Sequence, residues 1–290
     1  MSITRPTLIR AALAALSAAT LVALSACANY SQPATTATTP AASTIKGLAD
    51  LKGKVLAVQT DTTGQKYAED HKAEFGYEVK VFDDLPGTAN AVLAGTADAA
   101  INDNGVLYDF AKQNPTTKVV AEFDTGEQYG FNASKSNQGV INAVNEALAA
   151  AKKDGTYNTI YKKWFGTDAP TDVVSNATAT VVGSDKPVLV DSKYLTVCTH
   201  LAYRPFQFLD TDNSTIIGLD VDLVDLAAKK LGVTQKIVDI EFGQITSGSV
   251  FAAKKCDLGA AAITITEERK GAALYTDPYF DATQALLVKA

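Results

Sequence analysis

The chain contains few of the residues that usually build metal sites. Among its 290 residues are 2 histidines, 1 tryptophan, 1 methionine and 3 cysteines. Two histidines are too few for the histidine clusters of typical zinc sites, so we expect no metal and no bound cofactor. The formal net charge is −6, and an acidic chain is a poor partner for nucleic acid, so we expect no nucleic-acid binding.

What the chain does contain is typical of globular proteins. Its composition is 47% hydrophobic and 20% charged. This balance can form a buried core, and the length suffices for two domains of ordinary size.

The first 26 residues have the pattern of a secretory signal peptide. Arg5 and Arg10 give a positive start, and residues 11–26 carry no charge. This uncharged stretch of 16 residues is shorter than the roughly 20 that span a membrane as a helix. The sequence Leu-Ser-Ala-Cys at 24–27 resembles the lipobox of bacterial lipoproteins, which predicts lipidation of Cys27. An ordinary signal peptide followed by a chance cysteine is the alternative.

Residues 27–44 are expected to be a flexible, lipid-anchored tether. The stretch is rich in Ser, Thr, Ala and Pro and has too few large apolar residues to pack. We therefore expect an exported protein that is lipid-anchored to the outer face of the cytoplasmic membrane, or periplasmic.

The sequence leaves open whether Cys198 and Cys256 form a disulfide. An exported chain permits one. The alternative is two small buried residues in separate strands. Cys198 is expected late in its strand and Cys256 at the start of another, and this stagger argues against a bridge. A Cα separation above about 7 Å would exclude it.

Two stretches of the chain alternate strand-like and helix-like patterns, which predicts two α/β lobes. In the first stretch, the expected strands are 54–59, 77–82, 98–103 and 118–123. In the second, they are 194–199, 235–242, 257–263 and 284–289. Residues 169–192 are rich in Thr, Val, Asp and Ser and are expected to be a linker. In such folds ligands bind where strands end and helices begin.

The first candidate binding site follows a buried strand. In AAAITITEERK, residues 260–270, Thr264 lies at the turn and Arg269 lies at the start of a helix. A helix N-terminus offers free N–H groups to anions, and an arginine can hold a carboxylate with two parallel hydrogen bonds. These residues fit a carboxylate receptor; a capping threonine and a solvated arginine are the alternative.

Polar residues also follow two strands of the other lobe. Gln59, Thr62 and Thr63 lie between a strand and a helix, where they could bind a ligand or cap the helix. Asn102 and Asp103 end another strand, and the acid there could receive an ammonium group or cap the next helix. A cation on one lobe and an anion on the other would suit a zwitterion, of which a free α-amino acid is the obvious example.

Aromatic and histidine side chains could form a wall of the same pocket. His200 and Tyr203 leave a strand in a loop, and Phe242 ends another strand. Packing in the core is the default alternative for the aromatic residues.

Six segments of the chain have features in common with one protein family. They are RPFQFLDTDNSTIIGLDVDLVDLAAKKLG, CDLGAAAITITEERK, TDPYFDATQALLVK, IKGLADLKGKVLAVQTDTTGQKYA, EQYGFNASK and ALAAAKKDGTYNTIYKKWFG. Together they resemble family 3 solute-binding proteins, the polar amino-acid-binding components of ABC importers. The resemblance implies a two-lobed, periplasmic-binding-protein-like (type II) α/β fold with a hinge.

The order of these segments differs from that of the family. In the family, the segment that begins at residue 193 comes first, and the helix GTYNTIYKKWFG comes last. Here the second half precedes the first, which implies a circular permutation. Residues 169–192 would then join the family's usual C- and N-termini. One lobe would be 45–129, and the other would combine 130–168 with 193–290.

The resemblance also implies roles for the candidate residues. Arg269 would bind the α-carboxylate of the ligand, and Asp103 would bind its α-ammonium. Thr264 and Thr62 would add hydroxyl and backbone contacts to the carboxylate. Ala262 would accept a hydrogen bond from the ammonium through its backbone carbonyl.

Specificity would come from the pocket around the ligand's side chain. Tyr203 and Phe242 would form its aromatic walls. The sequence departs from the family at two positions: His200 stands where an aspartate is frequent, and Asp61 stands where a glycine is usual. Both departures affect which ligand side chain the pocket would recognise.

The resemblance implies a monomeric binding protein with no catalytic residues. Its lobes would close about a hinge on a free polar amino acid, which the chain would deliver to the membrane subunits of an ABC importer. A ligand sensor without transport and, less favoured, a dehydratase-type enzyme on the same fold are the alternatives. The C-terminal strand QALLVKA is expected to pack at the hinge, near residues 45–50.

Overall fold

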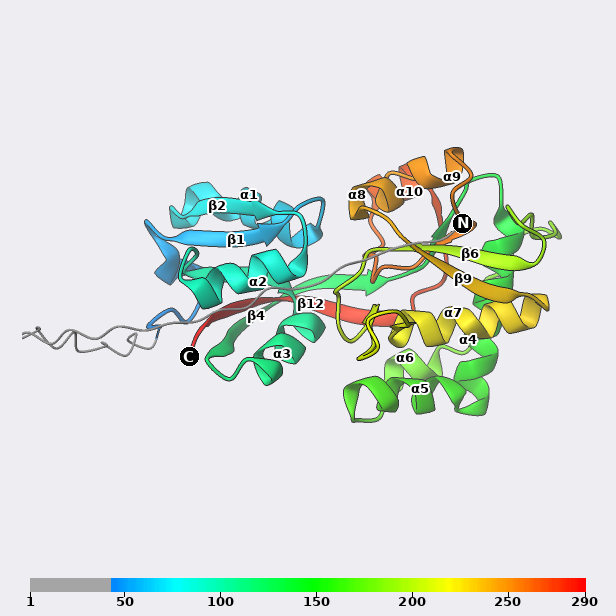
Figure 1. Cartoon of the computed structure of the whole chain (residues 1–290), viewed down its shortest axis with the longest axis horizontal. Coiled ribbons are helices and arrows are strands. Elements are labelled where there is room, and N and C mark those ends of the chain that lie inside the picture. Colours follow the sequence, from blue (N-terminus) through cyan, green and yellow to red (C-terminus); the bar gives the residue numbers. More distant parts are fainter. Residues whose placement is uncertain (1–42) are drawn as a thin grey trace, which may run out of the picture. The chain divides into compact units, whose positions relative to one another are not determined.

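The structure, a computed structural model, describes residues 43–290 (Figure 1). The predicted signal peptide, the lipidation site Cys27 and most of the predicted tether lie outside the described residues. Two five-stranded sheets, each packed against helices, form two lobes, which is the architecture that the sequence predicts. No helix within residues 43–290 is long and apolar enough to cross a membrane.

The first lobe is built on a sheet with the strand order β2-β1-β3-β12-β4. β1, β2 and β3 are parallel, and β12 runs antiparallel to β3 and β4. The strands are β1 (Val55–Gln59), β2 (Glu78–Phe82), β3 (Ala99–Asp103), β4 (Thr117–Tyr129) and β12 (Phe280–Lys289). The helices of this lobe are η1 (Leu48–Leu51), α1 (Thr63–Phe75), α2 (Leu85–Ala94) and α3 (Asn104–Gln113).

The second lobe contains a sheet with the order β11-β5-β10-β6-β9. Its strands are β5 (Asn132–Ala133), β6 (Tyr194–Thr199), β9 (Thr234–Asp239), β10 (Leu258–Gly259) and β11 (Leu274–Tyr275). The longer helices are α4 (Gln138–Asp154), α5 (Thr156–Phe165) and α7 (Leu219–Leu231). Short elements complete the lobe: α6 (Thr171–Ser175), β7 (Phe208–Leu209), β8 (Ile216–Ile217), α8 (Phe242–Thr246), α9 (Ser249–Ala252) and α10 (Glu267–Ala272).

The C-terminal strand differs from its expected lobe assignment. The sequence analysis places residues 193–290 in the second lobe, whereas β12 lies inside the first sheet, between β3 and β4. Residues 285–288 are fully buried, and a continuous apolar run is typical of a strand that is covered on both faces. Leu286 shares a buried core with Ile45, so the strand does pack near residues 45–50 as expected.

Two extended strands connect the lobes. β4 ends at Tyr129 and continues through Gly130 into the second lobe, while β12 enters the first lobe at Phe280. The two strands pair with each other, with Phe280 opposite Tyr129 and Lys289 opposite Thr117 (Figure 1). The connection is therefore one antiparallel ribbon, which we call the connecting ribbon, rather than two independent segments.

The aromatic helix α5 packs against the start of β12. The hydroxyl of Tyr157 donates to the backbone carbonyl of Tyr279, and Phe165 stacks on Phe280 with ring centroids 5.3 Å apart. The indole Nε1 of Trp164 donates to the carboxylate of Asp222 in α7 at 2.8 Å. This stripe of aromatic residues therefore attaches one end of the connecting ribbon to the second lobe.

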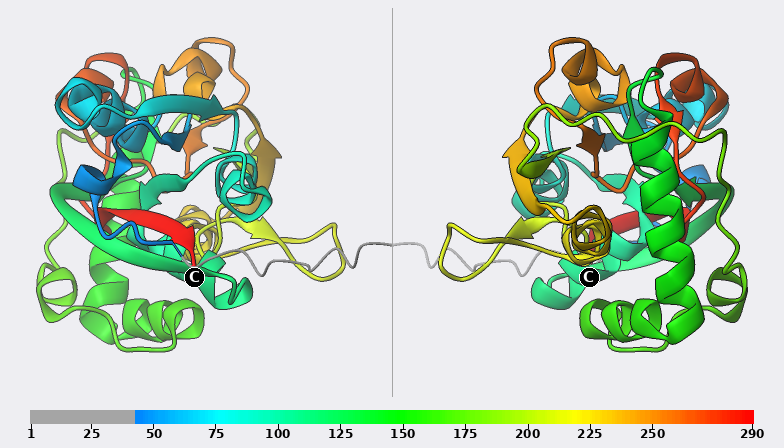
Figure 2. Two further views of the ribbon diagram at one scale, coloured as in Figure 1. Left: turned by 90° about the vertical axis from the view of Figure 1, so that its left-hand side faces the viewer. Right: turned by 90° about the vertical axis from the view of Figure 1, so that its right-hand side faces the viewer.

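The segment between α6 and β6, part of the predicted linker, is held along α4, although it has no regular structure of its own. Asn137 pairs with Val188, and Asn142 pairs with Val182, each through one donated and one accepted backbone hydrogen bond. Figure 2 shows this segment running beside the long helix α4. The side-chain amide supplies a donor and an acceptor, as a peptide group would, and so substitutes for a sheet ladder.

Replacing Asn142 with alanine should loosen this attachment. The substitution removes both hydrogen bonds to Val182, and a typical hydrogen bond contributes about 1 kcal/mol net. We expect the free energy of unfolding in urea to fall by about 1–2 kcal/mol. Asn176→Ala is the matched control, because Asn176 is exposed and its side chain makes no hydrogen bond within residues 43–290. Equal stability of the two variants would contradict the assigned role.

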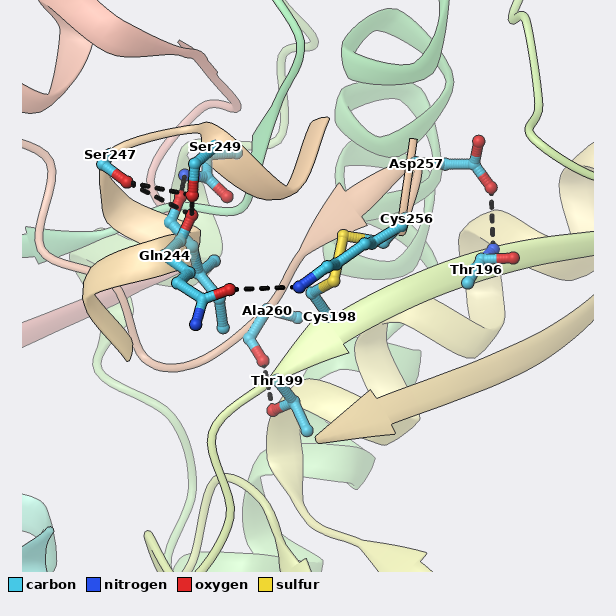
Figure 3. Close-up of a disulfide and its surroundings, with 12 residues drawn as sticks. Thr196, Cys198, Thr199, Gln244, Ser247, Ser249, Cys256, Asp257 and Ala260 are labelled. Atoms are coloured by element: carbon cyan, nitrogen blue, oxygen red, sulfur yellow. Dashed lines mark hydrogen bonds between the residues drawn. A yellow bond between two sulfur atoms is a disulfide. The ribbon is translucent and has the colours of Figure 1, made fainter. Parts of the chain in front are cut away.

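A disulfide joins β6 to the turn before β10. Cys198 is bonded to Cys256, and their Cα atoms lie 5.7 Å apart (Figure 3). The expected stagger does not prevent the bridge, because Cys256 lies in the turn that precedes β10 and not in a strand. The next residue, Asp257, accepts a hydrogen bond from the backbone N–H of Thr196 at 2.8 Å, which fixes the turn against β6.

The double substitution Cys198→Ser and Cys256→Ser should destabilise the protein. The cysteines are 58 residues apart, and in the chain-entropy model a loop of this size constrains the unfolded chain by about 4 kcal/mol. We expect a loss of about 2–4 kcal/mol in urea unfolding relative to the oxidised protein. The reduced wild-type protein is the control and should match the double variant. A double variant as stable as the oxidised protein would show that the bridge does not stabilise the fold.

Candidate ligand-binding site

A cavity lies between the two lobes, near the ends of β1, β3 and β6. It is lined by ten of the eleven residues that the sequence predicts to contact ligand: Gln59, Thr62, Thr63, Asp103, His200, Tyr203, Phe242, Ala262, Thr264 and Arg269. The eleventh, Asn102, contacts one of them, with its side-chain oxygen 2.6 Å from the hydroxyl of Tyr203. Gln207 and Ala261 also line the cavity, and the sequence analysis does not identify them.

Arg269 is held in a defined position at the start of α10. Its backbone N–H donates to the hydroxyl of the capping residue Thr266 at 3.1 Å. Its guanidinium donates to the carbonyl of Thr264 at 2.9 Å and, across the cavity, to the carbonyl of Asp61 in the first lobe at 2.8 Å. The guanidinium carbon also lies 5.3 Å from the centre of the Phe242 ring. Further N–H groups of the guanidinium remain for an anion.

Phe242 and Ala262 come from shorter elements than the sequence predicts. β9 ends at Asp239, so Phe242 begins the helix α8 instead of ending a strand. β10 covers Leu258–Gly259, and the residues after it leave the sheet to line the cavity. Ala262 has a φ of 48°, and its N–H donates to the buried carboxyl of Asp220 at 2.8 Å. Burial raises the pKa of Asp220 to about 7.

Gln59, Thr62 and Thr63 form the turn between β1 and α1. The hydroxyl of Thr62 accepts from the N–H of Gln65 at 3.0 Å, which caps α1, and donates to the carbonyl of Gln59 at 2.7 Å. The helix can begin this close to β12 because Gly64 lacks a side chain, and a Cβ atom there would lie 2.6 Å from Oε1 of Gln284. The turn is therefore placed against the connecting ribbon as well as the cavity.

Asp103 is buried and bonded to three protein donors. Its carboxyl accepts hydrogen bonds from the hydroxyls of Tyr129 and Tyr203 and from the side-chain amide of Gln284. Burial, and secondly the nearby charge of Glu127, raise the pKa of Asp103 to about 7. The three hydrogen bonds oppose this rise, because they stabilise the ionised form. Both protonation states of Asp103 are therefore accessible near neutral pH.

The sequence does not predict the second buried carboxylate, Glu127. One of its oxygens accepts from the hydroxyl of Thr63 in the first lobe at 2.7 Å and from that of Thr264 in the second lobe at 2.6 Å. The other accepts from the amide of Gln284 at 2.8 Å. β4 carries several exposed charged residues, so Glu127 has no sequence feature that distinguishes it from them. Its burial depends on where β4 meets both lobes.

Glu127 also sets the direction of two hydroxyl groups beside the cavity. Thr63 and Thr264 each have a single hydroxyl hydrogen, and both hydroxyls donate to the same carboxylate oxygen. In this arrangement their oxygens can accept from a ligand but cannot donate to one. A ligand carboxylate would therefore depend on Arg269 and on backbone N–H groups rather than on these hydroxyls.

The charges around the cavity are arranged on opposite sides. Arg269 lies on the second lobe, and Asp103 lies at the end of β3 in the first. The hydroxyl of Tyr203 reaches across from the second lobe and lies 2.8 Å from the carboxyl of Asp103. No cluster of three or more potential metal-ligating side chains occurs in the described chain, residues 43–290. The placement of the charges matches a small molecule with one negative and one positive end.

Comparison with known proteins gives a family match over most of the chain. The model of bacterial extracellular solute-binding proteins, family 3, matches residues 28–167 and 195–290. A solved structure, the arginine-bound form of truncated ArgBP from T. maritima, is 42% identical and covers 30% of this chain and 40% of that chain, with a TM-score of 0.29.

Two curated relatives have names that describe amino-acid binding. The L-cystine-binding protein TcyJ of Escherichia coli (strain K12) is 33% identical over 126 residues, which cover 43% of this chain and 47% of that protein. ABC transporter arginine-binding protein 1 of the same strain is 34% identical over 127 residues, which cover 42% of this chain and 51% of that protein. The chain thus spans about half the length of the curated relatives it matches. Because the family model matches more than half of the chain, this protein belongs to the bacterial extracellular solute-binding proteins, family 3, as its sequence segments predict.

Proposed function

We propose that the protein binds a free polar amino acid between its lobes and delivers it to an ABC importer. The observation that carries this proposal is the opposition of Arg269 and Asp103 across one cavity. A free α-amino acid carries a carboxylate and an ammonium group on the same carbon atom, and so offers a partner for each charge. The names of the cystine-binding and arginine-binding relatives support the same ligand class.

In the proposed complex, Arg269 holds the α-carboxylate and Asp103 holds the α-ammonium. The backbone N–H groups beside Thr62 and Thr264 add donors to the carboxylate, and the carbonyl of Ala262 accepts from the ammonium. A ligand ammonium compensates the charge of Asp103, whose burial otherwise favours the neutral acid. The aromatic residues at the cavity wall surround the ligand's side chain.

The proposed motion is closure about the connecting ribbon. Direct contacts between the lobes at the cavity include that of Arg269 with the carbonyl of Asp61 and those of the Tyr203 hydroxyl with Asn102 and Asp103. These contacts have to open for a ligand to enter, and a bound ligand can take the place of part of each. Hinge closure of this kind brings groups from two lobes onto one small molecule.

We also propose that the chain order is a circular permutation of the family order, with residues 169–192 as the joining linker. The family match stops at residue 167 and resumes at residue 195, which supports a linker there. The contacts of the linker with α4 support the same assignment, since they tie an added segment to the existing fold. Lipidation of Cys27 and a tether over 27–44 would hold the monomer at the membrane, next to the subunits of an importer.

Arg269→Ala should weaken amino-acid binding by at least tenfold. Loss of one partner of a buried, hydrogen-bonded charge contact costs about 2–5 kcal/mol, and about 1.4 kcal/mol is a factor of ten. A thermal-shift screen of the twenty amino acids identifies a ligand, and calorimetry then gives its affinity for each variant. Lys270→Ala is the control, because Lys270 is exposed and pairs with Glu267 outside the cavity. Unchanged affinity in the Arg269 variant would refute the assigned site.

Binding should also tighten as pH rises from about 5 to 8. The pKa of Asp103 is raised to about 7 by burial, so the carboxyl is mostly protonated at the lower pH and mostly ionised at the higher. The ammonium binds the ionised form, and two pH units below the pKa that form is about one hundredth of the total, which limits the gain to about 100-fold. Calorimetry across this range should show a much flatter profile for Asp103→Asn. A wild-type profile as flat as that of the variant would exclude Asp103 as the ammonium partner.

A further inference from the structure

Five buried side-chain atoms have no hydrogen-bond partner within residues 43–290, and two of them belong to residues that line the cavity. Those two atoms are Oε1 of Gln207 and Nε2 of His200. The side chain of Gln207 is almost entirely inaccessible, with 1% of its surface exposed. Buried polar groups are rarely left without a hydrogen-bond partner, so these two atoms point to a ligand that supplies the missing hydrogen bonds.

The amide of Gln207 has a fixed orientation. Its Nε2 lies 3.2 Å from the backbone carbonyl oxygen of His200, and a carbonyl oxygen can only accept a hydrogen bond. The atom that contacts this carbonyl must therefore be the NH₂ group. The remaining atom, Oε1, is an acceptor and cannot donate.

The imidazole of His200 is fixed in the same way. Its Nδ1 lies 3.1 Å from the backbone carbonyl oxygen of Ile240, so Nδ1 carries the hydrogen. In the neutral ring, Nε2 then has a lone pair and accepts. The two unpartnered atoms at the cavity are therefore both acceptors.

We propose that the ligand's side chain ends in a nitrogen group with N–H donors, such as a carboxamide, guanidinium or ammonium group, and that Gln207 and His200 select it. This inference rests on the proposed amino-acid binding and names the ligand's class. An acidic side chain would place its carboxylate oxygens against the two acceptors of Gln207 and His200. None of these atoms would then have a hydrogen-bond donor. Arg269 is the one cationic side chain that lines the cavity in the described part of the chain, and the α-carboxylate uses it.

The test compares near-isosteric amino acids by calorimetry at a single, mildly alkaline pH. Glutamine is paired with glutamate and asparagine with aspartate, while arginine and lysine test cationic donors. We expect the best-binding donor side chain to bind at least tenfold tighter than either acidic amino acid. Comparing the affinities for glutamine and asparagine with those for arginine and lysine shows whether the pocket prefers an amide or a cationic group. An acidic amino acid that binds as tightly as every donor side chain overturns the inference.

Two variants test whether these residues cause the selection. Gln207→Met keeps the length of the side chain but removes the acceptor, and His200→Phe removes the other acceptor. In each, we expect the preference for the donor over the acidic side chain to fall at least threefold. Gln235→Met is the matched control, because Gln235 is a partly buried glutamine in β9 that does not line the cavity. Unchanged preference in both folded variants overturns the inference.

The same experiments separate this inference from the proposed function. Binding of an acidic amino acid that Arg269→Ala weakens would leave the proposed function intact and refute the donor selection alone. Failure of all twenty amino acids to bind the wild-type protein would refute both. Thermal melting without ligand shows whether each variant is folded. If one variant does not fold, the preference measured for the other tests the inference.

Discussion

Two buried carboxylates, Asp103 and Glu127, have to be satisfied at the place where the lobes meet. A buried charge without partners is very costly, so the surrounding segments have to bring donors to it. Tyr129 and Gln284 bring donors from the connecting ribbon, and Tyr203 brings one from the second lobe. Each of these segments is therefore held at the cavity by hydrogen bonds to the same two carboxylates.

In the proposed mechanism, the connecting ribbon serves both as the hinge and as a scaffold of the binding site. Its β4 strand supplies Glu127, and its β12 strand supplies Gln284, whose amide donates to both acids. A rotation of one lobe changes the distances of Thr264 and Tyr203 to these acids, while the contacts within the first lobe stay. In the proposed mechanism, ligand binding, the protonation of Asp103 and the opening of the lobes would therefore be coupled through a few hydrogen bonds. The coupling needs no long-range path, since the groups are in direct contact.

The sequence predicts a large part of the fold, and the errors have local causes. Alternating strand and helix patterns correctly indicate two α/β lobes, and polar residues at strand ends correctly indicate the cavity. The sequence predicts a strand beside Cys256 because an apolar run follows at 258–263, whereas β10 covers only Leu258–Gly259 and Cys256 lies in the turn before it. Gln207 lies two residues after Pro205 in the loop before β7, so its burial has no local signal. Glu127 resembles the exposed charged residues of the same strand.

The sequence by itself determined the longer strands and helices, most of the residues that line the cavity, and which family the chain belongs to. These properties depend on periodicity, caps and short segments, all of which are local. Only the tertiary structure decided that β12 lies inside the first sheet and that Gln284, 181 residues from Asp103, contacts it. It also decided the raised pKa of Asp103 and the acceptor character of Gln207 and His200. Burial and hydrogen bonding between distant segments set these properties, because no single segment contains both partners.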